Sequence, residues 1–222
     1  MADRRSPRPP AFPAAAFILI LASSCGIDTL SYLGGAPRFV SESPGTVDFK
    51  AAAVPDPDCY GLDVFYRIYA GSDDAETDKT AIAERVQARS IPGDYVKSWL
   101  LSTGGLKYRK LSLDAGGETS PMLDSPADPE DLLVLSVLAG GSVEFKAGAA
   151  AAVPVYRNPG SVFPSFSVRP ADTDADYKPD TDDLLPDEYW VQFYAASYGI
   201  DATSWAELYS DVVYLGRIVI NY

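Results

Sequence analysis

Alternating apolar and polar residues, and short runs of β-branched and aromatic residues between turn signals, cover most of the chain after residue 45. Both patterns are typical of β-strands. A pair of apolar runs around glycines 140 and 141 predicts a hairpin within residues 132–147. The remaining strands are expected at residues 46–54, 62–70, 106–113, 153–157, 163–170, 188–198 and 212–221.

Only one segment has the periodicity of a helix. In residues 78–89, Ile82 and Val86 are four positions apart and share a face, and alanines on either side of Ile82 favour the helical state. Pro92 follows and ends the helix. The pattern therefore predicts a mainly β protein with one short helix.

The last long strands indicate a particular fold class. Alternation from Tyr189 to Ala195 places Tyr189, Val191 and Phe193 on one face and Trp190 and Tyr194 on the other. With Gly199 and the later Ser210-Asp211-x-Val213, this stretch resembles the last two strands of a fibronectin type III or related immunoglobulin-like domain. Residues 62–70 resemble its third strand.

The resemblance implies an antiparallel β-sandwich. The gap between the third strand and residue 189 is longer than such a module allows, so we expect an insertion around residues 73–187. Two subdomains that share a sheet would explain the same gap. Generic antiparallel β-structure without any immunoglobulin relationship is the other alternative.

The start of the chain has a different pattern. Arg4, Arg5 and Arg8 precede a run of nine apolar residues at 14–22. A membrane-spanning helix needs about 20 apolar residues. The run is therefore too short to span a bilayer permanently and instead predicts the hydrophobic region of an export signal.

A cysteine follows this run after two serines. The motif Leu21-Ala22-Ser23-Ser24-Cys25 resembles the lipobox of bacterial lipoproteins, in a relaxed form similar to that of spirochaete lipoproteins. The resemblance implies that residues 1–24 are a removable signal peptide and that Cys25 carries the lipid. Two alternatives remain: cleavage at the same bond by an ordinary signal peptidase, which would leave Cys25 free to pair with Cys59, or an uncleaved anchor.

Residues 25–45 contain glycines, prolines and no long apolar pattern, so they predict a flexible tether or an early edge strand. Residues 46–222 are the expected folded domain.

Charge and composition exclude several functions. The chain has 18 Lys and Arg against 31 Asp and Glu, a net charge of −13. Such a surface repels nucleic acid and anionic lipid headgroups, so contact with a bilayer must be covalent or apolar. Histidine is absent from the sequence, which removes the usual base of serine and cysteine hydrolases and the commonest zinc ligand. Two cysteines are too few for a disulfide scaffold.

One acidic stretch has the spacing of metal ligands. Counted from Asp172, the carboxylates lie at positions 1, 3, 5, 9 and 12, which resembles a calcium-binding loop of the EF-hand type. Tyr177 stands where that loop has glycine, and a solvated acidic linker is the alternative reading. The candidate calcium ligands are Asp172, Asp174, Asp176, Asp180 and Asp183.

These observations predict an exported, lipid-anchored protein of the cell envelope, on the inner or outer membrane. We expect its folded part to be a binding or structural module for another protein or a glycan, without catalytic residues. The alternative is an envelope enzyme that uses carboxylates, with or without a metal. Exposed aromatic residues on a flat face or loop tip would favour the module, whereas acids converging in a deep pocket would favour the enzyme.

Overall fold

The computed structural model describes residues 32–53, 57–124, 128–180 and 187–222. Its elements are mainly antiparallel β-strands, as the sequence predicts. The predicted signal peptide, Cys25 and the first part of the expected tether lie outside the described residues.

Within the described residues, one sheet has five strands in the order β1-β2-β6-β7-β8. The glycine pair at 140 and 141 turns the chain between β6 and β7 with positive φ angles of 84° and 80°, which confirms the predicted hairpin. The strands are β1 (Arg38–Ser43), β2 (Thr46–Lys50), β6 (Leu133–Val137), β7 (Val143–Ala147) and β8 (Val153–Pro154).

The other sheet has seven strands and is built around β10, which pairs with β3 on one side and with β11 and β12 on the other. The short strand β9 joins β3 in parallel, and all other pairs are antiparallel. The strands are β3 (Cys59–Tyr69), β4 (Arg109–Lys110), β5 (Leu123–Asp124), β9 (Tyr177–Lys178), β10 (Glu188–Ile200), β11 (Glu207–Tyr209) and β12 (Val213–Asn221).

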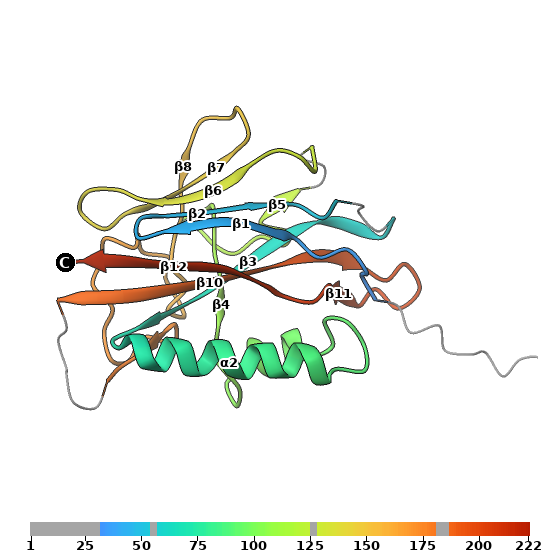
Figure 1. Cartoon of the computed structure of the whole chain (residues 1–222), viewed down its shortest axis with the longest axis horizontal. Helices are drawn as coiled ribbons and strands as arrows, with labels where there is room; N and C mark the ends of the chain where they lie inside the picture. Colours follow the sequence, from blue (N-terminus) through green and yellow to red (C-terminus); the bar gives the residue numbers. More distant parts are fainter. Residues whose placement is uncertain (1–31, 54–56, 125–127, 181–186) are drawn as a thin grey trace, which may run out of the picture. The chain divides into compact units, whose positions relative to one another are not determined.

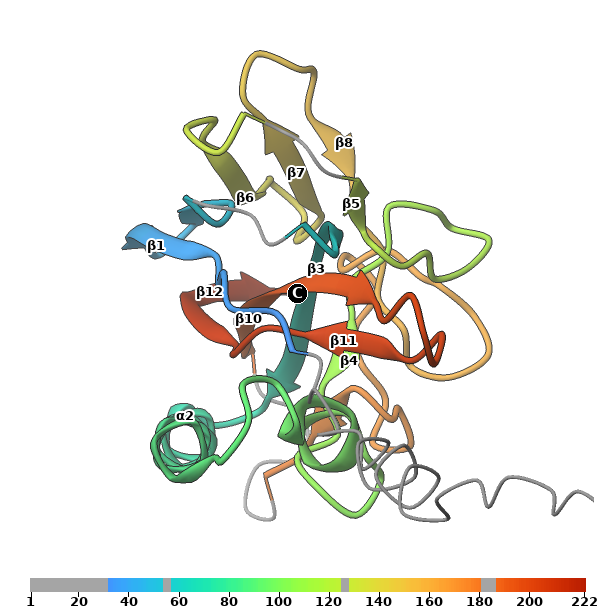
Figure 2. The ribbon, with the colours of Figure 1, turned by 90° about the vertical axis from the view of Figure 1, so that its right-hand side faces the viewer.

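The two sheets pack face to face, and helix α2 (Ser72–Ala88) lies against the far side of the seven-stranded sheet (Figure 1). The core between the sheets joins Val47 and Phe49 of β2 to Val64 of β3 and to Phe193 of β10. A second cluster joins Phe65 and Tyr194 to the helical layer. Figure 2 shows the same layers from the end of the domain.

This three-layer arrangement explains why β3 is apolar almost throughout. Val64, Tyr66 and Ile68 face the five-stranded sheet, and Phe65 and Tyr69 face the helices. Strands covered on both faces contain near-continuous apolar runs instead of alternating ones. Strand β10 follows the same rule, and its residues divide between the two faces as the sequence predicts.

The helix prediction is confirmed in place and corrected in extent. Helix α2 begins six residues earlier than expected, at Ser72, and ends at Ala88. Asp73 and Asp74 lie in its first turn, where carboxylates interact favourably with the helix dipole. The expectation of a single helix is wrong, because a short π-helical turn, η1 (Val96–Leu100), covers the same side of the sheet.

Several strand predictions differ from the structure. The strand expected at 46–54 ends at Lys50, and of residues 153–157 only Val153 and Pro154 form a strand. Of residues 106–113 only Arg109 and Lys110 form a strand, because the backbone N–H groups of Leu106 and Tyr108 donate to carbonyl oxygens of η1 instead. Residues 163–170 form no strand and contribute only a single bridge at Ser165.

The expected tether of residues 25–45 also requires correction, because β1 occupies Arg38–Ser43 and pairs with β2. The edge-strand alternative therefore holds for this part, and any tether ends before Arg38. The segment expected as an insertion, 73–187, supplies β6, β7 and β8, which are most of the five-stranded sheet. It is an integral part of the core.

Close packing at Gly61 provides a test of this architecture. A Cβ at Gly61 would overlap the carbonyl oxygen of Leu123, where β5 pairs with β3. We expect Gly61→Ala to lower the free energy of unfolding by about 1–3 kcal/mol, measured by urea denaturation. The matched control is Gly104→Ala, because a Cβ at Gly104 meets no atom within 4 Å. Equal stability of the two variants would contradict the described pairing.

Candidate functional site

The described residues contain three fully or almost fully buried carboxylates, Asp63, Asp78 and Asp176, with exposures of 0%, 4% and 0%. A buried charge is tolerated only when it is paired and hydrogen-bonded. These three groups are therefore the first candidates for chemistry, and the partners of each decide whether it is available to a substrate.

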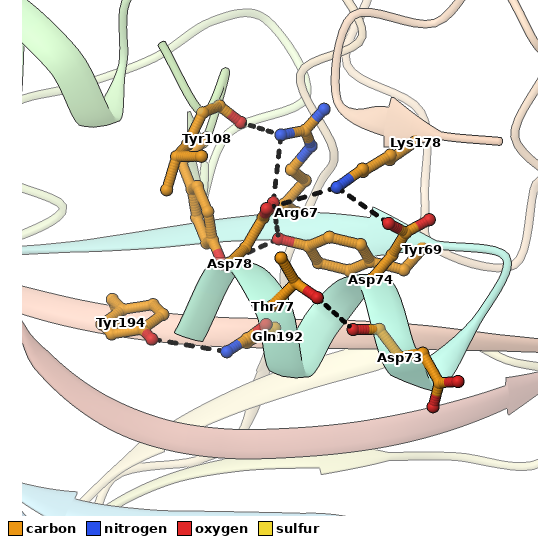
Figure 3. A network of polar contacts seen from close by, with 11 residues as sticks. Arg67, Tyr69, Asp73, Asp74, Thr77, Asp78, Tyr108, Lys178, Gln192 and Tyr194 are labelled. Atoms are coloured by element: carbon orange, nitrogen blue, oxygen red, sulfur yellow. Dashed lines mark hydrogen bonds and ion pairs between the residues drawn. The ribbon is translucent and has the colours of Figure 1, made fainter. Parts of the chain in front are cut away.

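Asp78 projects from α2 toward the sheet (Figure 3). One carboxylate oxygen lies 3.3 Å from the guanidinium of Arg67, and the other lies 3.2 Å from the ammonium of Lys178. Lys178 also contacts Asp74, one helical turn earlier, at 3.1 Å. The carboxylate thus fastens α2 to β3 and β9.

Two tyrosines complete this network. The Tyr69 hydroxyl donates to Asp78 at 2.9 Å, and the hydroxyl of Tyr108 lies 2.9 Å from that of Tyr69 (Figure 3). Because Tyr69 has one proton and gives it to the carboxylate, Tyr108 must donate to Tyr69. Burial raises the pKa of both phenols well above 10. They remain neutral donors in the physiological range.

Asp63, on the helix-facing side of β3, has an equally complete set of partners. Its carboxylate lies 3.1 Å from the Lys110 ammonium, accepts the backbone N–H of Met122 at 2.8 Å and accepts the hydroxyl of Tyr209 at 3.2 Å. These contacts join β3 to β4 and to the ends of β5 and β11.

The third carboxylate lies at the other face of β3. Asp176 accepts two hydrogen bonds from Arg157, at 3.0 Å and 2.9 Å, and one from the Tyr66 hydroxyl at 2.6 Å. Asp174 accepts a further bond from the same guanidinium at 2.7 Å. Arg157 is itself 0% exposed, so the cluster places a bidentate ion pair at the edge of the main core.

This cluster contains two of the predicted calcium ligands. Asp174 and Asp176 do converge, as the spacing predicts, but they converge on a guanidinium. Asp172 is exposed on the surface, the Asp180 carboxylate lies near Gly71, and Asp183 lies outside the described residues. Among the described residues no group of three or more acids or cysteines has the geometry of a metal site. Calcium binding stays a prediction, and a calcium ion there would have to compete with Arg157.

A different kind of feature lies at the end of the seven-stranded sheet. Trp205, in the turn between β10 and β11, is 79% exposed, the largest exposure of any large apolar side chain in the described residues. Tyr60 at the start of β3 and Tyr32 at the start of the described chain are 53% and 51% exposed. Tyr32, Tyr60 and Trp205 are called the aromatic end below.

Pairing and packing bring these three residues to the same end. Cys59, next to Tyr60, pairs with Gly199 of β10, and Gly199 pairs with Leu208 of β11. Tyr32 lines a cavity of about 230 Å³ together with Glu207 and Leu208. Figure 2 views the domain from this end, with the β10–β11 hairpin in front.

Hydrogen bonds within the turn fix the backbone conformation of Trp205, and its side chain is exposed. The Asp201 carboxylate accepts the backbone N–H groups of Thr203 and Ser204 at 2.7 Å and 2.9 Å, and the Trp205 N–H donates to the Asp201 carbonyl at 2.8 Å. Trp205 has a φ of 59°, in the left-handed region. For a residue with a side chain this conformation costs about 1–2 kcal/mol.

The cavity beside the aromatic end is polar on one side. Lys97 forms an ion pair with Glu207 across it, and this hydrogen bond lowers the pKa of the Glu207 carboxyl. Asp94 also lines the cavity. The acids here therefore do not converge as a catalytic pair, since the only close contact of Glu207 with a charged group in the described residues is with a lysine.

Comparison with known proteins gives no relative: no protein-family model, no curated protein and no solved structure matches the chain. No helix within residues that the structure describes is long and apolar enough to span a membrane.

Sequence reasoning named Asp176 as a calcium ligand but missed the buried carboxylates Asp63 and Asp78, the buried cations Arg67 and Arg157, and Trp205. A signal existed for Asp63 and Arg67, because they interrupt the otherwise apolar run of β3, and charges inside such a run require partners. Asp78 and Arg157 had no comparable signal. Trp205 stands alone in a polar turn sequence, and that contrast was the clue to its exposure.

The Arg157 cluster provides a second prediction. Replacing Asp176 with Asn removes the main countercharge of a fully buried guanidinium, so we expect Asp176→Asn to destabilise the domain by about 3–5 kcal/mol in thermal or urea unfolding. Asp172→Asn is the matched control, because Asp172 is exposed, and we expect a change within about 0.5 kcal/mol. If both substitutions had the same small effect, the described ion pair would be wrong.

The buried tyrosines predict instability in alkali. Burial raises the folded-state pKa of Tyr66, Tyr69 and Tyr108 above the unfolded value of 10, so the folded state holds these protons more tightly. Their contribution is complete below pH 10 and is lost as the pH rises further. Each lowers the free energy of unfolding by about 1.4 kcal/mol per pH unit between its two pKa values.

Urea denaturation across the alkaline range measures this slope. Tyr108→Phe removes one of the three groups and is expected to make the decline less steep. Tyr60→Phe, at an exposed position, is the control that leaves the slope unchanged. A domain whose stability stayed flat above pH 10 would contradict the burial of these phenols.

Proposed function

We propose that this protein is an exported lipoprotein of the bacterial envelope, anchored to a membrane through an acylated Cys25. The observation that carries the proposal is the position of this cysteine. It comes directly after a basic start, a run of nine apolar residues at 14–22 and two small serines. Each buried methylene of an acyl chain contributes about 0.8 kcal/mol, and two chains are sufficient for stable attachment.

We further propose that the folded domain is a binding or structural module for a protein or glycan partner. Two features support this function over the carboxylate enzyme. Each of Asp63, Asp78 and Asp176 contacts a cation that neutralises it and also joins parts of the fold. The most exposed large apolar side chain of the described residues, Trp205, stands on a hairpin tip, which suits contact with another surface, whether of a partner or of a membrane, better than a catalytic pocket.

The proposed fold type is an enlarged immunoglobulin or fibronectin III-like sandwich. The pairing order β3-β10-β12 supports it, because the third strand of such a module lies beside its penultimate strand, which in turn lies beside the last. The helical layer over β3 and β10 is an addition to that plan. In this proposal it converts the outer face of the sheet from a solvated surface into a second core.

The anchor is tested by replacing Cys25 in the full precursor. Cys25→Ala is expected to move the domain from the membrane fraction to the soluble fraction, because the acyl chains that hold it are missing. Cys59→Ala is the matched control and is expected to leave the protein in the membrane fraction. Intact mass of the wild-type mature protein is expected to fit a chain that begins at Cys25 with added acyl groups.

Two results would end this proposal. One is unchanged membrane partitioning of Cys25→Ala. The other is a mature protein whose mass corresponds to an unmodified cysteine or to a retained leader.

A further inference from the structure

We propose that the aromatic end of the domain rests on the bilayer, with Trp205 of the β10–β11 hairpin inserted at the lipid–water interface. This inference depends on the proposed anchor at Cys25 and adds an orientation to it. The bilayer then contacts the protein at two places, the acyl chains and the aromatic end.

The length of the chain before the domain supports this orientation. Six residues lie between Cys25 and Tyr32, which makes seven steps along the chain, and a fully extended chain advances at most about 3.6 Å per step, so Tyr32 lies within about 25 Å of the anchored cysteine. A compact domain of about 190 residues is roughly 40 Å across. The end at which the described chain begins is therefore held nearer to the lipid than the opposite end is.

The described chain begins at the aromatic end itself. Tyr32 lines the cavity against β11, and the Leu33 side chain packs against Gly199, the residue that pairs with both Cys59 and Leu208. Trp205 lies two residues before β11, about 7 Å along an extended chain. The short link thus brings Trp205 and Tyr60 to the membrane together with Tyr32.

The chemistry of these side chains suits an interface. Trp and Tyr have a large apolar ring and one polar group, and they concentrate where a membrane meets water. Trp205 remains exposed in a backbone conformation that disfavours side chains. Covering the exposed ring of Trp205 removes apolar surface from water and lowers the free energy, and the bilayer is the surface that the anchor brings within reach.

Charge determines which lipids fit. Asp201 and Glu207 lie within the hairpin, and Asp94 lines the adjacent cavity together with the cation Lys97. This surface cannot be attracted to anionic headgroups, so the contact is apolar and suits a zwitterionic bilayer. We therefore expect it to be insensitive to salt and to be weakened by anionic lipid.

Tryptophan emission tests the inference directly. The mature acylated protein is reconstituted into phosphatidylcholine vesicles made with ordinary or brominated acyl chains, and its emission is compared with that of Trp205→Phe. We expect brominated lipid to quench the wild-type protein and to leave Trp205→Phe unchanged, because Trp99 and Trp190 are partly buried within the domain. Aqueous iodide is expected to reach Trp205 less after reconstitution than before it.

A second variant keeps the test valid if Trp205→Phe does not fold. The chain has three tryptophans, so Trp99→Phe with Trp190→Phe leaves Trp205 as the single reporter. This double variant is expected to show the full quenching by brominated lipid. Including phosphatidylglycerol in the vesicles is expected to reduce that quenching.

The outcomes separate the two proposals. Protein that does not float with the vesicles overturns the anchor and this inference together. Protein that floats but is not quenched by brominated lipid, with Trp205 fully open to iodide, overturns the inference alone. The aromatic end would then face water, where it is a surface for a soluble protein or glycan.

Discussion

Strands β3 and β10 pair along almost their whole length and are covered on both faces, by the five-stranded sheet on one side and by α2 and η1 on the other. This double coverage is the constraint on which the rest of the structure depends. It places two apolar cores on one pair of strands, and it removes from water the charged groups Asp63 and Arg67 within β3. Asp63 and Arg67 are consequently buried and must find partners inside the protein.

The buried charges therefore determine how the outer parts are attached. Asp78 reaches Arg67 from the helix, Lys110 reaches Asp63 from β4, and Arg157 with Asp176 closes the edge of the main core. Removing one partner of a buried ion pair strongly destabilises a protein, whereas replacing both partners with apolar residues is often neutral. These contacts therefore specify the arrangement more than they stabilise it. These carboxylates form ion pairs inside the fold. The side chains that a ligand can reach therefore lie at the surface, above all at the aromatic end.

Prediction from the sequence succeeded where the signal is local. The hairpin between β6 and β7 follows from a glycine pair between apolar runs, and α2 follows from Ile82, Val86 and Pro92. Prediction failed where apolar and polar residues alternate but most of the backbone does not pair as a strand. In residues 106–113, Leu106 and Tyr108 pack in the helical layer, whereas Leu111 and Leu113 pack against the core between the sheets. The backbone N–H groups of Leu106 and Tyr108 donate to η1 and not to a neighbouring strand. The carboxylate pattern at 172–176 was recognised, but its partner Arg157 is far enough along the chain that no spacing rule links them.

The sequence by itself determined the class of fold, the identity of the central strands, the faces of β10, and the short apolar run at 14–22 that precedes Cys25. These properties depend on neighbours along the chain, and residue order contains them. Only the tertiary structure decided that residues 73–187 build most of the second sheet, that buried carboxylates meet particular cations, and that Trp205, Tyr60 and Tyr32 share one end. Those properties arise when distant segments pack against each other, because burial and charge pairing depend on distances in space that periodicity along the chain does not specify.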